Sequence, residues 1–193
     1  MGTKGSANRQ RIVDAADRLF YSRGYNQTSF SDISDETGIP RGNFYYYFKT
    51  KEEILAAVVE SRVAVFKAML DECDQQSSDP RERLLLFVDM PVQNEEQIIQ
   101  YGCPIGTLSS ELAKDQVHEI SKAKLTAVFD VLIEWCVAQF VALGLDTNAK
   151  RYAMELSARL QGNALMANVY NDSDFLQSTT KDIQSWVKQI TAN

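Results

Sequence analysis

The spacing of apolar residues predicts two short amphipathic helices at the start of the chain. Over residues 8–23 the apolar side chains recur with helical periodicity on one face, and Gly24 is well placed to end that helix. Ser29 is followed three residues later by Asp32, a pairing that resembles a capping box with Asp in place of the usual Glu. We therefore predict a second helix that begins after Ser29 and ends near Thr37.

A glycine turn and two further helices follow. Gly38 tolerates the positive φ that a tight turn between helices needs. The next predicted helix covers residues 41–48, where Phe44 and Phe48 lie four residues apart and point to one side. A long helix is then predicted over residues 51–74. The first three of these helices, with the Gly38 turn between the second and third, have the outline of a helix-turn-helix unit.

The rest of the chain keeps the helical periodicity, interrupted by linkers. The polar run 75–78 marks a linker, Asp79 with Pro80 restarts a helix, and Pro91 is expected to kink or break it. Residues 101–104 mark another break, before a short helix to about residue 114. Further helices are predicted near residues 116–143, 147–170 and 174–190. The chain is therefore predicted to be all-α, with about nine helices.

Composition agrees with a globular helical protein. Of 193 residues 45% are hydrophobic, with only 9 Gly and 4 Pro, which favours long helices over a turn-rich β fold. The three cysteines are odd in number and widely spaced, so we expect no disulfide framework and a cytoplasmic location. The N-terminus lacks the apolar run of a signal peptide. Polar residues inside the most apolar stretch, 125–145, argue against a membrane span.

The distribution of charge matters more than its total. The net charge of −6 at first argues against a nucleic-acid partner. Residues 1–55, however, carry eight Lys and Arg against seven Asp and Glu, a net charge of +1. The acidic excess therefore belongs to the rest of the chain. This pattern permits DNA binding without demonstrating it.

The helix predicted over residues 41–48 carries three adjacent tyrosines at 45–47 that cannot all face the core. Their hydroxyl groups, with Lys49 and Lys51 nearby, are suited to phosphate oxygens. A packed aromatic cluster beside solvated lysines is the alternative interpretation. Residues 41–43 form the N-terminal end of the helix, which is the part that meets base edges in helix-turn-helix proteins.

Residues 28–55 strongly resemble the DNA-binding signature of the TetR family of transcriptional regulators. The most diagnostic stretch is Gly42-Asn43-Phe44-Tyr45-Tyr46-Tyr47-Phe48-Lys49-Thr50-Lys51-Glu52. The resemblance covers roughly residues 8–60, and beyond them only length and helix order match. Pro40 departs from the family, which usually has Ser or Thr there, so a side-chain cap is absent and a phosphate contact at this position is in doubt.

The resemblance implies that the protein is a homodimeric transcriptional repressor that binds double-stranded operator DNA. Residues 1–50 would form the helix-turn-helix domain, and residues 51–193 an all-α helical bundle that dimerises and binds a small-molecule effector. Thr28 would contact phosphate, Gly42 and Asn43 would lie against bases, and no cofactor is implied. The expected DNA-binding residues are Thr28, Arg41, Gly42, Asn43, Tyr45, Tyr46, Tyr47, Lys49 and Lys51.

The predicted effector domain is rich in aromatic and Met side chains, which suit an apolar or flat ligand. Ordinary core packing is the alternative for each of them. Candidate ligand contacts are Phe87, Tyr101, Cys103, Phe129, Trp135 and Met166, and the interior is also expected to contain Met90, Leu132, Met154, Leu165 and Tyr170.

Cys103 can be interpreted in two ways, and so can the small residues of the helix predicted near 147–170. Cys103 stands before Pro104 and a predicted helix, whose dipole favours the thiolate. Some members of the family sense oxidants or electrophiles through a cysteine in a similar context, whereas the competing interpretation is a small buried residue. Small side chains on the helix predicted near 147–170 suit either a dimer interface or packing within one subunit. They are Ser157, Ala158, Gly162, Ala164 and Ala167.

The sequence lacks the features that an enzyme or a metal protein would need. His118 is the only histidine, and with three scattered cysteines it makes no metal-binding pattern. No hydrolase, phosphate-loop or dinucleotide motif is present. A helical protein-interaction adaptor is the main alternative to a repressor, and it predicts no salt-dependent DNA binding. In a repressor, we expect the helix over residues 51–74 to couple effector and DNA, because it alone joins the two regions covalently.

Overall fold

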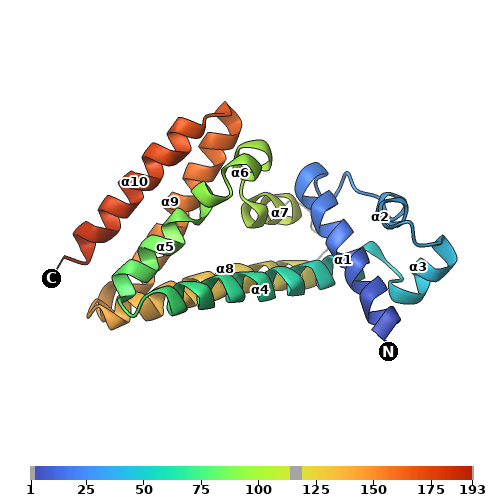
Figure 1. The fold of residues 1–193 in the computed structure, drawn as a ribbon, viewed down its shortest axis with the longest axis horizontal. Helices are drawn as coiled ribbons and strands as arrows, with labels where there is room; N and C mark the ends of the chain where they lie inside the picture. Colours follow the sequence, from blue (N-terminus) through green and yellow to red (C-terminus); the bar gives the residue numbers. More distant parts are fainter. Residues whose placement is uncertain (1–2, 114–118, 193) are drawn as a thin grey trace. The chain divides into compact units, whose positions relative to one another are not determined.

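A computed structural model of the protein describes residues 3–113 and 119–192, of which residues 3, 4, 41 and 119–125 are described by their backbone alone. Within these ranges the chain is helical without strands, which confirms the all-α prediction, and it forms ten α-helices and one short 3-10 helix. In chain order they are α1 (Thr3–Arg23), α2 (Phe30–Thr37), α3 (Arg41–Tyr47), α4 (Lys51–Gln76), α5 (Pro80–Gln93), α6 (Glu95–Tyr101), α7 (Pro104–Ala113), α8 (Glu119–Ala142), η1 (Asp146–Asn148), α9 (Ala149–Tyr170) and α10 (Ser173–Ile190), as Figure 1 shows. None of the helices described is long and apolar enough to cross a membrane.

The chain divides into two compact units that are each discontinuous in sequence. The first unit contains residues 1–64 and 107–128, and the second contains residues 65–106 and 129–193. Helices α4, α7 and α8 therefore each run from one unit into the other. The expectation that the helix over 51–74 alone joins the two regions is wrong, because two further helices also do so. The domain boundary expected at residue 50 stays a prediction.

Local signals in the sequence set the helix ends of the first unit. Ser29 accepts a hydrogen bond from the Asp32 N–H at 3.1 Å, and Asp32 accepts one from the Ser29 N–H at 2.7 Å, which confirms the capping box. Hydrogen bonds from Ser29 also hold the pKa of the Asp32 carboxyl below its usual value. The cap is therefore present when Asp32 is charged and weakens as the pH falls through that lowered pKa. Gly38 ends α2 with a φ of 63°, as predicted.

The core of the first unit is mainly apolar, and a buried arginine is paired beside it. Ile12, Ile33 and Phe44 are each fully buried. The Arg62 guanidinium, which is itself buried, pairs with Asp17 at 2.6 Å and ties α4 to α1. This pairing compensates for the desolvation of the Arg62 charge.

In the second unit, α10 packs on α5 and α9, and α9 packs on α6. Asp79 caps α5 by accepting a hydrogen bond from the Arg81 N–H at 2.9 Å, as predicted. The break expected at Pro91 is displaced. Helix α5 continues through Pro91 to Gln93, and Asn94 separates it from α6.

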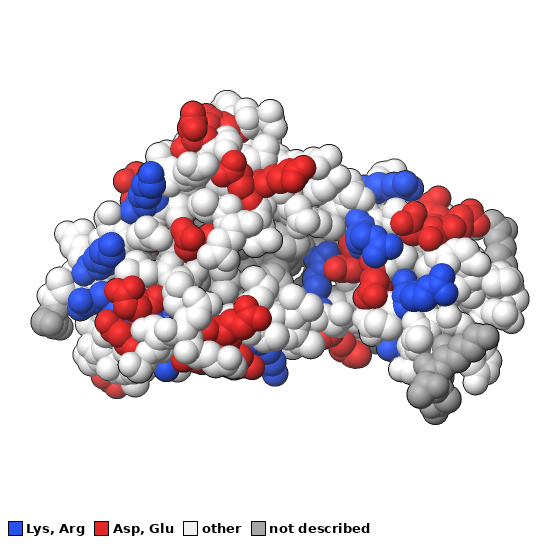
Figure 2. All heavy atoms as spheres, in the orientation of Figure 1, with Lys and Arg blue, Asp and Glu red and all other residues white. Residues whose placement is uncertain are grey.

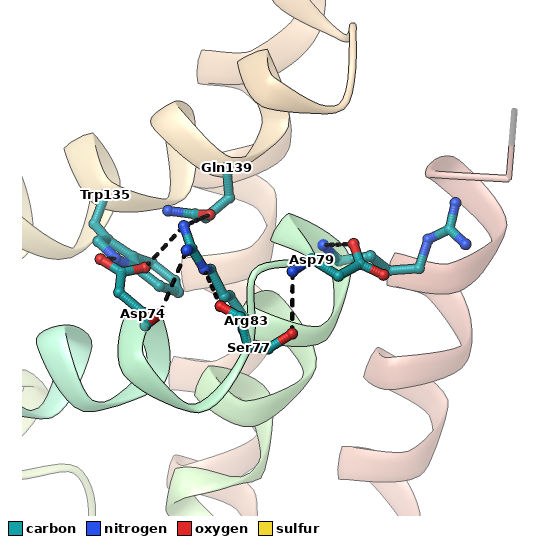
Figure 3. A network of polar contacts seen from close by, with 7 residues as sticks. Asp74, Ser77, Asp79, Arg83, Trp135 and Gln139 are labelled. Atoms are coloured by element: carbon teal, nitrogen blue, oxygen red, sulfur yellow. Dashed lines mark hydrogen bonds and ion pairs between the residues drawn. The ribbon is translucent and has the colours of Figure 1, made fainter.

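One guanidinium organises the junction of α4, α5 and α8 in the second unit. Figure 3 shows Arg83 between the end of α4 and the side of α8. It donates to the Ser77 carbonyl at 2.7 Å and pairs with Asp74 at 3.3 Å, while the Trp135 indole N–H donates to Asp74 at 3.2 Å. The Gln139 side chain completes the network at 3.5 Å from Arg83. These contacts fix the last turn of α4, where backbone carbonyls lack helical partners.

Candidate nucleic-acid interface

Helix α3 presents polar and aromatic groups to solvent because its apolar face is anchored in the first unit. Phe44 and Phe48 are 0% and 3% exposed, whereas Tyr45 and Tyr46 are 52% and 67% exposed. This confirms the prediction that the two phenylalanines face inward. The exposed rings of Tyr45 and Tyr46 carry hydroxyl groups that can donate to phosphate oxygens.

The three tyrosines are held by contacts at their rings or hydroxyl groups. Tyr45 stacks on Phe30, with ring centroids 5.1 Å apart. Tyr46 and Tyr47 meet edge to face at 5.3 Å, and the Tyr47 hydroxyl accepts a hydrogen bond from the Asn8 amide at 3.1 Å. The aromatic cluster and the DNA-contact interpretations are therefore compatible, since packing pre-orders side chains that remain accessible.

The N-terminal end of α3 is open to a close approach. Pro40 precedes the helix and makes no side-chain cap, as the sequence indicated. Gly42 and Asn43 are exposed, and a Cβ built at Gly42 would meet no atom within 4 Å. Packing inside the protein therefore does not require glycine at position 42, whereas an external surface lying against the backbone there would. The side chain of Arg41 lies outside the described residues, as does His118.

Two of the residues expected to contact DNA make hydrogen bonds within the first unit. The Thr28 side chain is 1% exposed, and its hydroxyl donates to the Gly24 carbonyl at 2.8 Å. The Lys51 ammonium donates to the carbonyls of Tyr25 and Thr28 at 3.0 and 3.1 Å and lies over the Tyr25 ring. A phosphate contact from either side chain stays a prediction, and for Thr28 it would require the buried hydroxyl to be exposed.

Lys49 is different, because its side chain is exposed. Its ammonium donates to the Tyr45 carbonyl, and its backbone N–H donates to Glu53 at 2.7 Å. The lysine therefore lies at the end of α3 with room for further partners. Figure 2 shows Lys and Arg interspersed with Asp and Glu over the face drawn.

Comparison with known proteins identifies the family. Residues 12–58 match the family described as bacterial regulatory proteins, tetR family. An uncharacterized helix-turn-helix transcriptional regulator from the lacX 3' region of Lactococcus lactis is 32% identical over 174 residues, which are 88% of both chains. The chain belongs to the TetR family. Another such regulator, YxaF of Bacillus subtilis, is 31% identical over 137 residues, covering 69% of this chain and 68% of the relative.

A solved structure extends this similarity to the whole fold. The TetR transcriptional regulator from Legionella pneumophila has a TM-score of 0.80 and 25% identity, covering 96% of this chain and 97% of its own. The protein is thus a TetR-family DNA-binding transcriptional regulator and not an enzyme. The resemblance read from residues 28–55 is confirmed.

The expected effector contacts of this TetR-family chain fall into two groups. Phe87 is 6% exposed, and its ring lies 5.7 Å from that of Trp135, which donates to Asp74. Tyr101, Cys103 and Phe129 are half-buried within the second unit. Met166, by contrast, is 41% exposed on α9. Their binding of an effector stays a prediction.

Helix α9 has an exposed apolar face made of residues that were predicted to be interior. The expectation that Met154, Leu165, Met166 and Tyr170 are interior is wrong, because they are 51%, 59%, 41% and 70% exposed. Helical periodicity does not distinguish an apolar stripe that packs into the core from one that is exposed on the surface of the subunit. Of the small residues, Ala164 and Ala167 pack within the subunit, whereas Ala158 and Gly162 are exposed.

One long-range contact of the first unit was not predicted from the sequence. The Glu111 carboxylate accepts hydrogen bonds from the backbone N–H groups of Tyr25 and Asn26, at 2.8 and 2.6 Å. No pattern of neighbouring residues predicts this contact, because Glu111 is 86 residues from Tyr25 and 85 residues from Asn26 in the sequence.

Proposed function

We propose that the protein is a homodimeric transcriptional repressor that leaves its operator when a small molecule binds the second unit. The observation that carries the DNA-binding part is the exposed surface of α3, since Tyr45 and Tyr46 are more than half exposed while Phe44 beside them is fully buried. Gly42 and Asn43 would lie against base edges, and Asn43 is suited to pair with adenine. Tyr45, Tyr46, Tyr47 and Lys49 would hold the phosphate backbone.

The apolar face of α9 supports the homodimer. Leu165, Val169 and Tyr170 are 59%, 66% and 70% exposed on one helix, more than a soluble monomer usually leaves uncovered on one element. Exposed Ala158 and Gly162 on the same helix allow a second helix to approach closely. A two-fold dimer would place two α3 helices in successive major grooves, ~34–36 Å apart, on a palindromic operator.

Effector release is proposed from the aromatic residues of the second unit. Phe87 and Trp135 lie together, and Trp135 is hydrogen-bonded to Asp74 in the last turns of α4. A flat or apolar ligand against these rings would favour one position of α4 over another. Such a ligand acts by shifting the population toward a conformer whose α3 helices no longer match the operator.

The experiment that tests this function measures binding of the purified protein to DNA flanking its own gene, by fluorescence anisotropy across a salt series. We expect tight, sequence-specific binding whose affinity falls steeply as salt rises, because phosphate contacts release counterions. A random-sequence selection pool provides a second source of operator sequences. Weak binding to the flanking DNA and to the random-sequence pool, with little dependence on salt, would favour the alternative of a protein-interaction adaptor.

Replacing Tyr46 with Ala is expected to reduce operator affinity about tenfold at fixed salt, because a phosphate contact and an exposed aromatic surface are both lost. The Tyr46→Phe variant keeps the ring and loses only the hydroxyl, so it should lie between wild type and Tyr46→Ala. Anisotropy titrations check both, with circular dichroism to show that the fold is retained. Unchanged affinity for Tyr46→Ala would show that the DNA-binding surface lies elsewhere.

Cys103 is expected to be the fast-reacting thiol of this protein. Burial raises the pKa of Cys136 and of Cys73, which leaves little thiolate at neutral pH, whereas Cys103 is partly exposed. Labelling with N-ethylmaleimide at pH 7 should therefore modify one cysteine quickly, as counted by mass spectrometry, and Cys103→Ser should abolish that fast phase. If electrophiles are the effectors, the modified protein loses operator affinity and Cys103→Ser does not. An equal response from Cys103→Ser would exclude sensing through this residue.

A further inference from the structure

The turn between α1 and α2, residues 24–28, is held from both sides by charged side chains. Lys51 of α4 donates to two of its carbonyls, those of Tyr25 and Thr28. Glu111 of α7 accepts from two of its N–H groups, those of Tyr25 and Asn26. All of these residues belong to the first unit. The turn is therefore clamped by one cation and one anion from helices that are far apart in sequence.

The fit of Glu111 to the turn is close. Gly24 has a φ of 91°, and a Cβ built on it would lie 3.1 and 3.2 Å from the two carboxylate oxygens of Glu111. Glycine thus serves two needs here, since it adopts the left-handed conformation and leaves room for the carboxylate. Hydrogen bonds from two N–H groups to a carboxylate are among the stronger ones in proteins.

The clamped turn leads directly to α2 and α3, which together are called the DNA-reading helices. Residue 29, which follows it, is the N-cap of α2, and Phe30 in the first turn of α2 packs against Phe44 and Tyr45 of α3 at 4.8 and 5.1 Å. A shift of the turn therefore displaces the start of α2 and, through Phe30, the exposed face of α3.

The other end of α7 is anchored in the second unit. Helix α7 begins at Pro104, directly after Cys103, and its residues 104–106 belong to that unit. A Cβ built at Gly106 would clash with the side-chain oxygen of Gln161, so the first turn of α7 packs closely on α9. One continuous helix thus touches α9 at one end and the α1–α2 turn at the other.

We propose that Glu111 is a positioning residue for operator binding, and that it makes α7 a second link, beside α4, from the second unit to the DNA-reading helices. The inference rests on the proposed use of α3 to bind the operator. A purely stabilising role is the alternative. It predicts that removal of Glu111 lowers thermal stability without changing how the folded protein discriminates operator from other DNA.

The first test compares Glu111→Ala, Glu111→Gln and Asp14→Asn. Asp14 is an exposed carboxylate on α1 whose partner Gln10 lies on the same helix, so Asp14→Asn removes an equal charge without touching the turn. Amide hydrogen exchange in the absence of DNA should be at least about tenfold faster at Tyr25 and Asn26 in Glu111→Ala. Glu111→Gln, which keeps one acceptor oxygen, should be intermediate, and Asp14→Asn should match wild type. Unchanged exchange in Glu111→Ala would overturn the clamp itself, whatever the protein binds.

Operator affinity then distinguishes positioning from stability. Removing a negative charge should, by electrostatics alone, leave DNA binding unchanged or slightly tighter, as expected for Asp14→Asn. We expect Glu111→Ala to bind the operator about tenfold more weakly while its affinity for random DNA and its salt slope stay close to wild type. If Glu111→Ala bound the operator as tightly as wild type but had a lower melting temperature, Glu111 would be only a stabilising residue and the proposal would be overturned. Loss of operator binding by wild type as well would instead reject the proposed function.

The link through α7 is tested with N-ethylmaleimide at Cys103 as the probe. A bulky adduct directly before α7 should displace its first turn, and we expect exchange at Tyr25 and Asn26 to rise about threefold or more in the fully labelled protein. Cys103→Ser carried through the same treatment should show no change. Complete labelling without any effect on the two amides would refute a link through α7.

Discussion

Replacing Val169 with Asp is expected to convert the proposed dimer to monomers and to weaken operator binding by at least about a hundredfold, because a desolvated carboxylate at the centre of the proposed interface would be strongly unfavourable. Val169 is 66% exposed on the apolar face of α9, so the single chain should tolerate the change. Two half-sites are then bound independently, and the affinity gained from simultaneous binding is lost. Sedimentation velocity measures the first effect and anisotropy the second.

Val65→Asp provides the matched control for this substitution. Val65 is 54% exposed on α4, outside the α9 face, and undergoes the same change of side chain and charge. It should remain a dimer with operator affinity near that of wild type. A dimeric Val169→Asp, or a monomeric Val65→Asp, would place the interface on another surface.

Replacing Phe44 with Ala is expected to reduce the free energy of unfolding by about 3–5 kcal/mol, as is usual when a large buried aromatic side chain is truncated. Phe44 is 0% exposed and meets Phe30 at 4.8 Å, so the cavity would open beneath the exposed face of α3. Chemical denaturation at fixed protein concentration measures the loss, since dimer stability depends on concentration. Operator binding should fall with it, because the tyrosines lose their support.

Tyr45→Ala is the control for stability, on the same helix and with the same loss of an aromatic ring. Tyr45 is 52% exposed and stacks on Phe30, so we expect a loss of about 1 kcal/mol. Its operator affinity should nevertheless fall, because the proposal places its hydroxyl on phosphate. If both variants lost equal stability, the division of α3 into a buried and an exposed face would be incorrect.

Features that depend on neighbouring residues were predictable from the sequence. The capping box of Ser29 and Asp32, the left-handed Gly38 and the inward pair Phe44 and Phe48 each arise within one or two helical turns. The departure of Pro40 from the family pattern likewise predicted that α3 has no side-chain cap. Near-neighbour physics therefore determines most of the helix-turn-helix.

Features that depend on distant partners were not predictable in this way. Lys51 was expected to contact phosphate because it lies near the three tyrosines and matches the family signature, and the sequence did not predict that its ammonium donates to carbonyls 26 and 23 residues away. Thr28 was expected to contact phosphate, which stays a prediction, and the sequence did not predict that its hydroxyl is buried and donates to the Gly24 carbonyl. On α9, Leu165 and Val169 have the periodicity of core residues, and only the packed fold shows that they are 59% and 66% exposed.

The discontinuity of the first unit has a consequence for building chimeric regulators. A fragment cut after residue 64 would contain α1, α2 and α3 but would leave out residues 107–128 of the same unit, with Glu111 among them. The N–H groups of Tyr25 and Asn26 would then lose their shared acceptor. Moving the N-terminal helices of this protein onto another C-terminal domain with this contact intact therefore means moving α7 together with them, or supplying an acidic side chain at the equivalent place in the recipient.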